Sequence, residues 1–158
     1  MSVSSITIRE ATLEDLDVLV ACHVAYGREG EGTELDEDRL GKGIEGVLHS
    51  RDRGFFLMAE VDGRTVGEMQ VRYEWSTWRN ATFWWLENVY VLPEWRRRGI
   101  FTAMHRYVYN EARRRDEVCG IRLYAAAENQ GARQTYRSLG MTGHLCEFFE
   151  QDFVLGGH

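Results

Sequence analysis

The stretch ENVYVLPEWRRRGIF, residues 87–101, joins an apolar run to an amphipathic one and decides how the chain folds. Up to Leu92, residues 82–92 (TFWWLENVYVL) are almost continuously apolar and rich in aromatic and β-branched side chains, which is typical of a buried central strand. Pro93, the only proline, marks the end of that strand. From Ile100 to Ala112 apolar residues recur every three or four positions, which predicts a long helix.

The junction between this strand and this helix carries chemistry that suits an anion. The first amides of a helix have no intrahelical partner and lie at the positive end of the helix dipole, so they bind phosphate well. Gly99 would let the backbone approach such a ligand, and the guanidinium groups of residues 96–98 would add charge-assisted hydrogen bonds. The junction predicts a phosphate or pyrophosphate site, with a solvated run of surface charge as the alternative.

The rest of the chain predicts an α/β (α+β) fold with a mixed, mainly antiparallel sheet flanked by helices. Asp62-Gly63 separates two apolar runs and is a strong signal for a β-hairpin. No repeat or low-complexity linker interrupts the sequence, so residues 1–158 are expected to form a single domain. The other expected elements are a strand through Ile6 and Ile8, a helix over 13–24, a glycine-rich loop over 26–33, a helix over 40–48, strands over 54–61, 65–73 and 121–125, a helix over 129–139 ended by Gly140, and a strand within 145–155.

Composition excludes several classes of protein. With 19 basic and 25 acidic residues, the net charge of −6 disfavours a nucleic-acid-binding protein, although arginine triplets stand at 96–98 and 113–115. No apolar run approaches the ~20 residues that cross a bilayer, and the first residues do not resemble a secretory leader, so a cytoplasmic location is expected. Three widely spaced cysteines and scattered histidines suggest neither a disulfide framework nor a metal site.

Two motifs in order resemble the GNAT superfamily of acyl-CoA-dependent N-acetyltransferases. Arg96, Gly99 and Ile100 fit the family's acetyl-CoA motif, in which Phe101 replaces the last small residue. A second signature follows at the expected distance: Asn129, Ala132, Tyr136, Leu139 and Gly140. The resemblance implies a sheet whose two central strands splay apart to admit the cofactor.

The resemblance also implies roles for particular residues. Acetyl-CoA would be the co-substrate, without a metal, and a primary amine, expected to be a small molecule, would be the acceptor. Glu87 would be the general base, with a structural hydrogen-bond acceptor as the alternative, and Tyr136 would protonate the thiolate unless it is an ordinary half-buried tyrosine. The cofactor would bind Val89, Tyr90, Val91, Arg96, Arg97, Arg98, Gly99, Ile100, Phe101 and Asn129, and the acceptor Tyr26, Glu29, Tyr73, Trp75 and Trp84.

Two alternatives stay open at this point. A non-catalytic acyl-CoA-binding sensor would keep the cofactor cleft without needing both Glu87 and Tyr136. The resemblance is also compatible with a homodimer.

Overall fold

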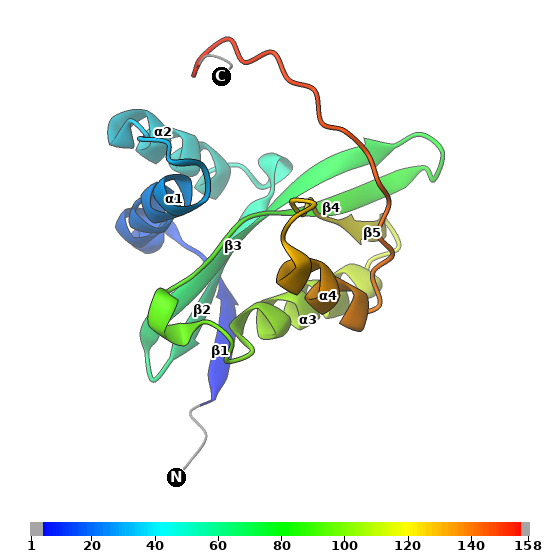
Figure 1. Ribbon diagram of the computed structural model, residues 1–158, viewed down its shortest axis with the longest axis horizontal. Coiled ribbons are helices and arrows are strands. Elements are labelled where there is room, and N and C mark those ends of the chain that lie inside the picture. Colours follow the sequence, from blue (N-terminus) through cyan, green and yellow to red (C-terminus); the bar gives the residue numbers. More distant parts are fainter. Residues whose placement is uncertain (1–4, 156–158) are drawn as a thin grey trace. The chain divides into compact units, whose positions relative to one another are not determined.

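The computed structural model describes residues 5–155, in two compact units: the first ends at Tyr124 and the second begins at Ala125 (Figure 1). The first unit holds a five-stranded sheet in the order β1-β2-β3-β4-β5, antiparallel throughout except for the parallel pair β4–β5. This confirms the predicted fold class. In chain order its elements are β1 (Ile6–Glu10), α1 (Leu16–Glu31), α2 (Glu37–Leu48), β2 (Phe55–Val61), β3 (Arg64–Ser76), β4 (Ala81–Val91), α3 (Ile100–Arg113) and β5 (Val118–Arg122).

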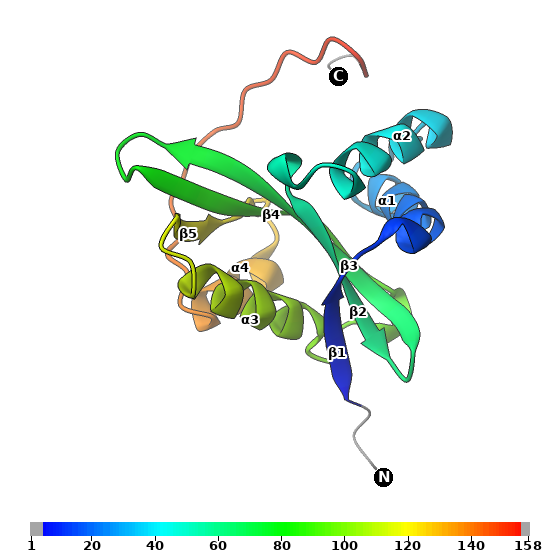
Figure 2. The same cartoon turned by 180° about the vertical axis from the view of Figure 1, so that it is seen from behind.

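Helices cover both faces of this sheet, α1 and α2 on one and α3 on the other (Figures 1 and 2). Strand alternation explains the division, because odd-numbered residues of β2 pack toward α3 and even-numbered ones toward α1 and α2. Leu57 lies in the α3 cluster with Met104 and Val108, whereas Met58 packs with Leu19 of α1. All four of the side chains at 57, 58, 104 and 108 have no exposed surface.

A β-bulge interrupts the pairing of β3 with β4. Tyr90 pairs with Glu68 and Glu87 with Gln70, so Asn88 and Val89 together oppose the single residue Met69. Asn88 takes φ = 47°, a left-handed conformation that asparagine tolerates better than most residues. Because side chains alternate along a strand, the extra residue brings Glu87 and Tyr90, three positions apart, onto the same face.

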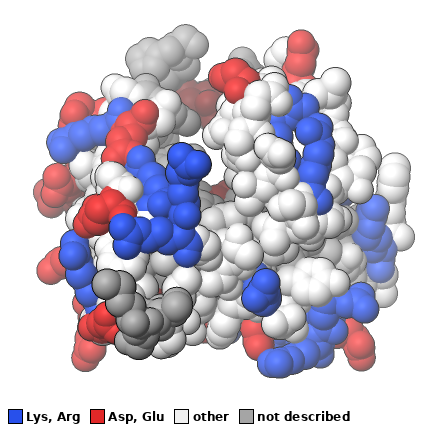
Figure 3. All heavy atoms as spheres, turned by 60° about the horizontal axis from the view of Figure 1, so that its bottom comes forward, with Lys and Arg blue, Asp and Glu red and all other residues white. Residues whose placement is uncertain are grey.

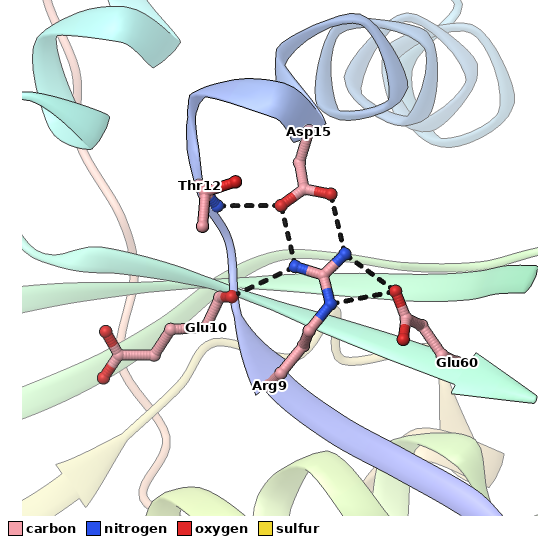
Figure 4. Close-up of polar contacts among 5 residues, drawn as sticks. All are labelled: Arg9, Glu10, Thr12, Asp15 and Glu60. Carbon is pink, nitrogen blue, oxygen red and sulfur yellow. Dashed lines mark hydrogen bonds and ion pairs between the residues drawn. The ribbon is translucent and has the colours of Figure 1, made fainter. Parts of the chain in front are cut away.

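An arginine fixes the turn from β1 into α1 (Figure 4). The Arg9 guanidinium donates to both Asp15 oxygens at 2.8 Å and, through Nε, to Glu60 of β2 at 2.9 Å. Asp15 also accepts the Thr12 backbone N–H at 2.7 Å. These bonds hold α1 at a fixed place beside β2 and so position the helix face that lines the site.

Two elements of the first unit differ from the sequence prediction. Residues 26–31, expected in a loop, continue α1 to Glu31, because the chain folds back there: Gly32 is left-handed and the Thr33 N–H donates to the Gly27 carbonyl. β5 runs over Val118–Arg122, earlier than expected. β4 is buried over residues 83–86 but only half-buried over 87–89, so its predicted complete burial is wrong at the bulge and at Glu87, which precedes it.

The second unit contains α4 (Gln130–Ser138). Asn129 caps it by accepting the Ala132 N–H, and Gly140 follows it at φ = 85°. The strand expected within 145–155 does not form in the described part, and the side chains of Leu145 and Phe149 are more than 80% exposed. Adjacent Phe148 and Phe149 break the period of two that a half-buried strand needs, which explains the error.

The Arg9 network makes a pH-dependent contribution to stability. Hydrogen bonds from the Arg9 guanidinium lower the pKa of Asp15 below its ordinary value, so this stabilisation is lost as the pH falls through the lowered pKa. Asp15→Asn should cost about 1–3 kcal/mol of unfolding free energy at neutral pH, and the cost should shrink toward about pH 3. Urea denaturation at several pH values measures it, with the exposed Asp17→Asn as the control. An equal cost at every pH would show that the ionised carboxylate is not the stabilising group.

Candidate active site

The loop before α3 presents unpaired amides. A single 3-10 turn, Pro93–Trp95, leads into Arg97 at φ = 62° and Gly99 at φ = 81°, two left-handed residues that turn the backbone sharply. α3 starts at Ile100 with no side chain capping its first turn. Uncapped amides at the positive end of a 14-residue helix are groups of the kind that bind phosphate.

Beside this loop, β4 loses its partner strand. The register between β4 and β5 ends at Trp85↔Arg122, although β4 continues to Val91. Within the described chain, β4 therefore has no strand on its β5 side beyond Trp85. Backbone groups left this way can pair with an extended ligand, as a strand would.

A pocket of about 400 Å³ lies against this stretch of β4. α1 forms one wall and the end of β4 the other. The structure thus brings together residues that the sequence analysis assigned separately to the cofactor and to the acceptor. The residues that line the pocket are Tyr26, Glu29, Gly30, Val89, Tyr90, Val91 and Arg96.

Arg96 is held by the protein itself. Its Nη2 donates to Glu29 at 2.6 Å, its Nε donates to the Val91 carbonyl at 2.9 Å, and its guanidinium lies over the Tyr90 ring. The Tyr90 hydroxyl donates to the other Glu29 oxygen at 2.9 Å. Hydrogen bonds from Arg96 and Tyr90 lower the pKa of Glu29, so the carboxylate stays ionised and engaged.

Glu87 lies on the α1 side of the sheet. Its side chain is 29% exposed, whereas the apolar sequence of β4 predicts a fully buried position. Arg72 Nε donates to its Oε1 at 2.9 Å, and Oε2 has no donor among the described residues. Next to it, Asn88 donates to Gln70 at 2.7 Å, which fixes the bulge. Arg72 was missed by the sequence analysis, and only its place opposite this stretch of β4 could have indicated it.

The remaining acceptor candidates of the first unit do not line this pocket. Tyr73 and Trp84 face α3 and line a cavity of about 190 Å³ there, because strand alternation points them away from α1. Trp75, near the end of β3, is 61% exposed. Asn129 and the half-buried Tyr136 belong to the second unit, where Asn129 caps α4. The structure therefore does not collect the five expected acceptor residues into one site.

A second acidic residue is buried beneath the same face. Glu68, opposite Tyr90, has no exposed surface, and its Oε1 lies 3.0 Å from Nδ1 of His23, which is also 2.9 Å from the Leu19 carbonyl. Neither Glu68 oxygen has a well-aligned donor among the described residues. Burial raises the pKa of Glu68, and, although burial opposes it, the Glu68 carboxylate raises the pKa of His23.

On the face shown in Figure 3, basic and acidic side chains intermingle and neither sign covers the whole of it. Over residues 5–155, no group of three or more His, Cys, Asp or Glu side chains is placed to hold a metal ion. In the same range, no helix combines the length and the apolar character needed to span a membrane.

A mixed sheet in which β4 runs on past its parallel partner β5, beside an uncapped, arginine-rich helix start, suits a protein that binds an extended ligand carrying phosphate groups. The model of the acetyltransferase (GNAT) family matches residues 16–141, so the chain belongs to this family of acetyltransferases.

Relatives agree with this assignment. The chain is 30% identical over 132 residues to an uncharacterised N-acetyltransferase of Archaeoglobus fulgidus, covering 83% of this chain and 89% of that protein. It is 27% identical over 155 residues to one of Methanocaldococcus jannaschii, which covers 98% of this chain, but the chain spans only 65% of that protein's length.

Solved structures show the same fold. The structure of a "possible acetyltransferase" from Clostridium difficile 630 has a TM-score of 0.84 and 37% identity, covering 94% of this chain and 98% of that one. A "predicted acetyltransferase" from Clostridium acetobutylicum, solved with acetyl-CoA, has a TM-score of 0.73 and 22% identity, covering 98% and 100% of the two chains.

The buried Glu68–His23 pair should make stability fall with rising pH. Both pKa values are raised, so the folded protein binds more protons than the unfolded chain once the pH exceeds the ordinary value of Glu, about 4.5. The pKa of neighbouring Cys22 is raised to about 12, which keeps this thiol protonated in that range. Glu68→Gln should flatten the fall of unfolding free energy between about pH 5 and pH 8, measured by urea denaturation. Parallel curves for the parent and Glu68→Gln, with exposed Glu94→Gln as the control, would contradict this.

The ion pair of Glu29 with Arg96 should compete with a phosphate-bearing ligand. In Glu29→Gln the guanidinium keeps its place on Tyr90 but loses its charged partner, so the affinity for CoA should rise by up to about fivefold, the range of a solvent-exposed ion pair. Titration calorimetry at low and high salt measures this rise, which should shrink at high salt. Glu34→Gln, which breaks the exposed pair of Glu34 with Arg28, is the matched control. Weaker binding by Glu29→Gln would show instead that Glu29 holds Arg96 in its binding position.

Proposed function

We propose that the protein transfers the acetyl group of acetyl-CoA to a primary amine of a small molecule by direct attack. The observation that carries this proposal is the unpaired backbone of β4 beyond Trp85, which ends at the uncapped start of α3. Pantetheine is an extended, amide-bearing chain attached to a pyrophosphate. The unpaired backbone of β4 suits the amide-bearing chain, and the uncapped start of α3 suits the pyrophosphate.

The residues present fit such a ligand. Amides of residues 97–101 would hold the pyrophosphate, and the positive φ of Gly99 is one that a side chain would strain. The backbone of residues 89–91 would pair with pantetheine. Arg96 would assist the phosphates through the N–H groups that Glu29 and Val91 do not take, those of Nη1 first.

The chemistry divides between two side chains. Acetyl-CoA, when bound, supplies an acetyl group activated as a thioester. Glu87 would take a proton from the attacking amine through Oε2, the oxygen that Arg72 leaves without a donor. As the nitrogen–carbon bond forms and the carbon–sulfur bond breaks, Tyr136 would give its hydroxyl proton to the departing sulfur. The products are an N-acetylated amine and free CoA.

The alternative is an acyl-CoA-binding sensor without catalysis. One observation favours it: Glu87 is paired with Arg72, as a purely structural carboxylate would be. Both functions need the cofactor cleft, so only a catalytic measurement separates them.

Substitution of the proposed general base tests whether the protein is an enzyme. Glu87→Gln should lower kcat by roughly 10²–10⁴-fold with CoA affinity nearly unchanged, because a general base acts in the transition state and not in cofactor binding. Tyr136→Phe should likewise slow transfer more than it weakens binding. Thiol release over a panel of primary amines measures turnover, and calorimetry measures affinity.

The matched control is Glu60→Gln, which removes another half-buried strand carboxylate paired with an arginine, Arg9. It should leave kcat close to the parent value. Unchanged kcat in Glu87→Gln and Tyr136→Phe would remove both residues from the mechanism. Tight acetyl-CoA binding without transfer to any amine would favour the sensor.

A further inference from the structure

The sheet face next to Glu87 carries a cluster that the proposed mechanism does not use. Phe83 and Trp85 of β4 are each only 7% exposed. Because Trp84 and Leu86 belong to the α3 cluster, strand alternation points Phe83 and Trp85 to the opposite face of the sheet, the face that carries Glu87. Arginines stack on them: Arg122 lies 3.6 Å from the centre of the Phe83 ring, and Arg72 lies 5.3 Å from that of Trp85. We call these four residues the arginine–aromatic face.

Charge on this face does not balance. Arg122 pairs with Glu74 at 2.6 Å and Arg72 with Glu87 at 2.9 Å. Arg79, which also stacks on Phe83, has no carboxylate partner within the described chain. Three guanidinium groups therefore meet two carboxylates, and the one without a carboxylate partner among the described residues is that of Arg79, on the Phe83 ring.

A buried donor on the same face lacks an acceptor. The indole Nε1–H of Trp85 is out of contact with solvent and has no hydrogen-bond partner in the described part of the molecule. Leaving such a donor unpaired costs about 1–3 kcal/mol, which an incoming oxygen could recover. The groups packed against the indole belong to Arg72, Arg122 and Tyr124, whose side chains are at least 40% exposed, so a ligand can displace them.

The position of this donor relates it to the reaction. Trp85 and Arg122 form the last pair of β4 with β5, so they stand where the two strands part. Glu87 lies two residues further along β4, on the same face, and Arg72 touches both Glu87 and the indole. An acceptor with its amine at Glu87 would therefore place its next few atoms over the indole, toward Arg122.

Resting on the function proposed above, we infer that the acceptor is a small amino acid, an amine that also carries a carboxylate a few bonds away. Its ammonium group binds at Glu87, and its carboxylate binds the Arg122 fork and the Trp85 N–H. Carboxylate geometry matches a guanidinium bidentately, and the desolvated indole adds a donor that a neutral amide satisfies less well than an anion. A primary amide in place of the carboxylate offers the Trp85 N–H only a neutral carbonyl oxygen and gives the Arg122 guanidinium no charged partner beyond Glu74.

An experiment with matched acceptors tests this without relying on catalysis. Glycine, β-alanine and 4-aminobutanoate are each titrated against their primary amides while the indole ¹H–¹⁵N signals are followed by NMR in the presence of CoA, with Trp85 assigned through Trp85→Phe. We expect the Trp85 signal to shift with at least one amino acid and not with its amide. Arg122→Met, which keeps the stem over Phe83, should abolish the shift, and Arg79→Met, which removes an arginine stacked on the same ring, should retain it.

Arg122→Lys provides a variant that keeps the charge without the fork and should weaken the shift if Arg122→Met fails to fold. In acetyl transfer, the acid should exceed its amide by roughly 10–100-fold in kcat/KM, a preference that Arg122→Met removes. Equal shifts with acid and amide, or no shift with either, would overturn the inference. A selective shift without acetyl transfer would support amino acid binding and count against the proposed enzymatic function.

Discussion

The bulge at residues 88–89 of β4 is the constraint on which the candidate site depends. One extra residue reverses the facing of everything beyond it, so Glu87 and Tyr90 look toward α1 together. Without it, either the carboxylate or the tyrosine that contacts Glu29 would point into the α3 cluster. The bonded Asn88–Gln70 pair and the left-handed Asn88 show that side-chain chemistry maintains the irregularity.

Glu29 makes α1 part of the site. It ties the last turn of this helix both to Tyr90 and to Arg96, the first residue of the arginine run. Arg9 secures the other end of the same region through Asp15 and Glu60. α1 is thus fastened to the sheet by ion pairs at both of its ends and by apolar packing at Leu19 between them.

Much of this fold can be predicted from the sequence, because the spacing of apolar residues indicates which face of each helix or strand is buried. The Asp62-Gly63 hairpin, the long helix after Gly99 and the uncapped loop before it follow from local chemistry. The Glu29–Arg96 and Glu87–Arg72 pairs do not, because they join residues far apart in the chain and depend on a register that the bulge alters. The strand expected within 145–155 is a different case, because the broken alternation at Phe148 and Phe149 is visible in the sequence itself.

Gly27 and Gly30 make the last turn of α1 less stable than the rest of the helix. Each glycine weakens a helix by roughly 0.5–1 kcal/mol relative to alanine, so the final turn opens more readily than the turn around Leu19. A larger residue at position 27 is disfavoured, because a Cβ there would lie 3.2 Å from the Thr33 carbonyl oxygen. Amide hydrogen exchange should therefore be faster in the turn that carries Glu29 than in the turn around Leu19, and a ligand that draws Arg96 away would leave the Tyr90 hydroxyl as the remaining donor to Glu29 from β4.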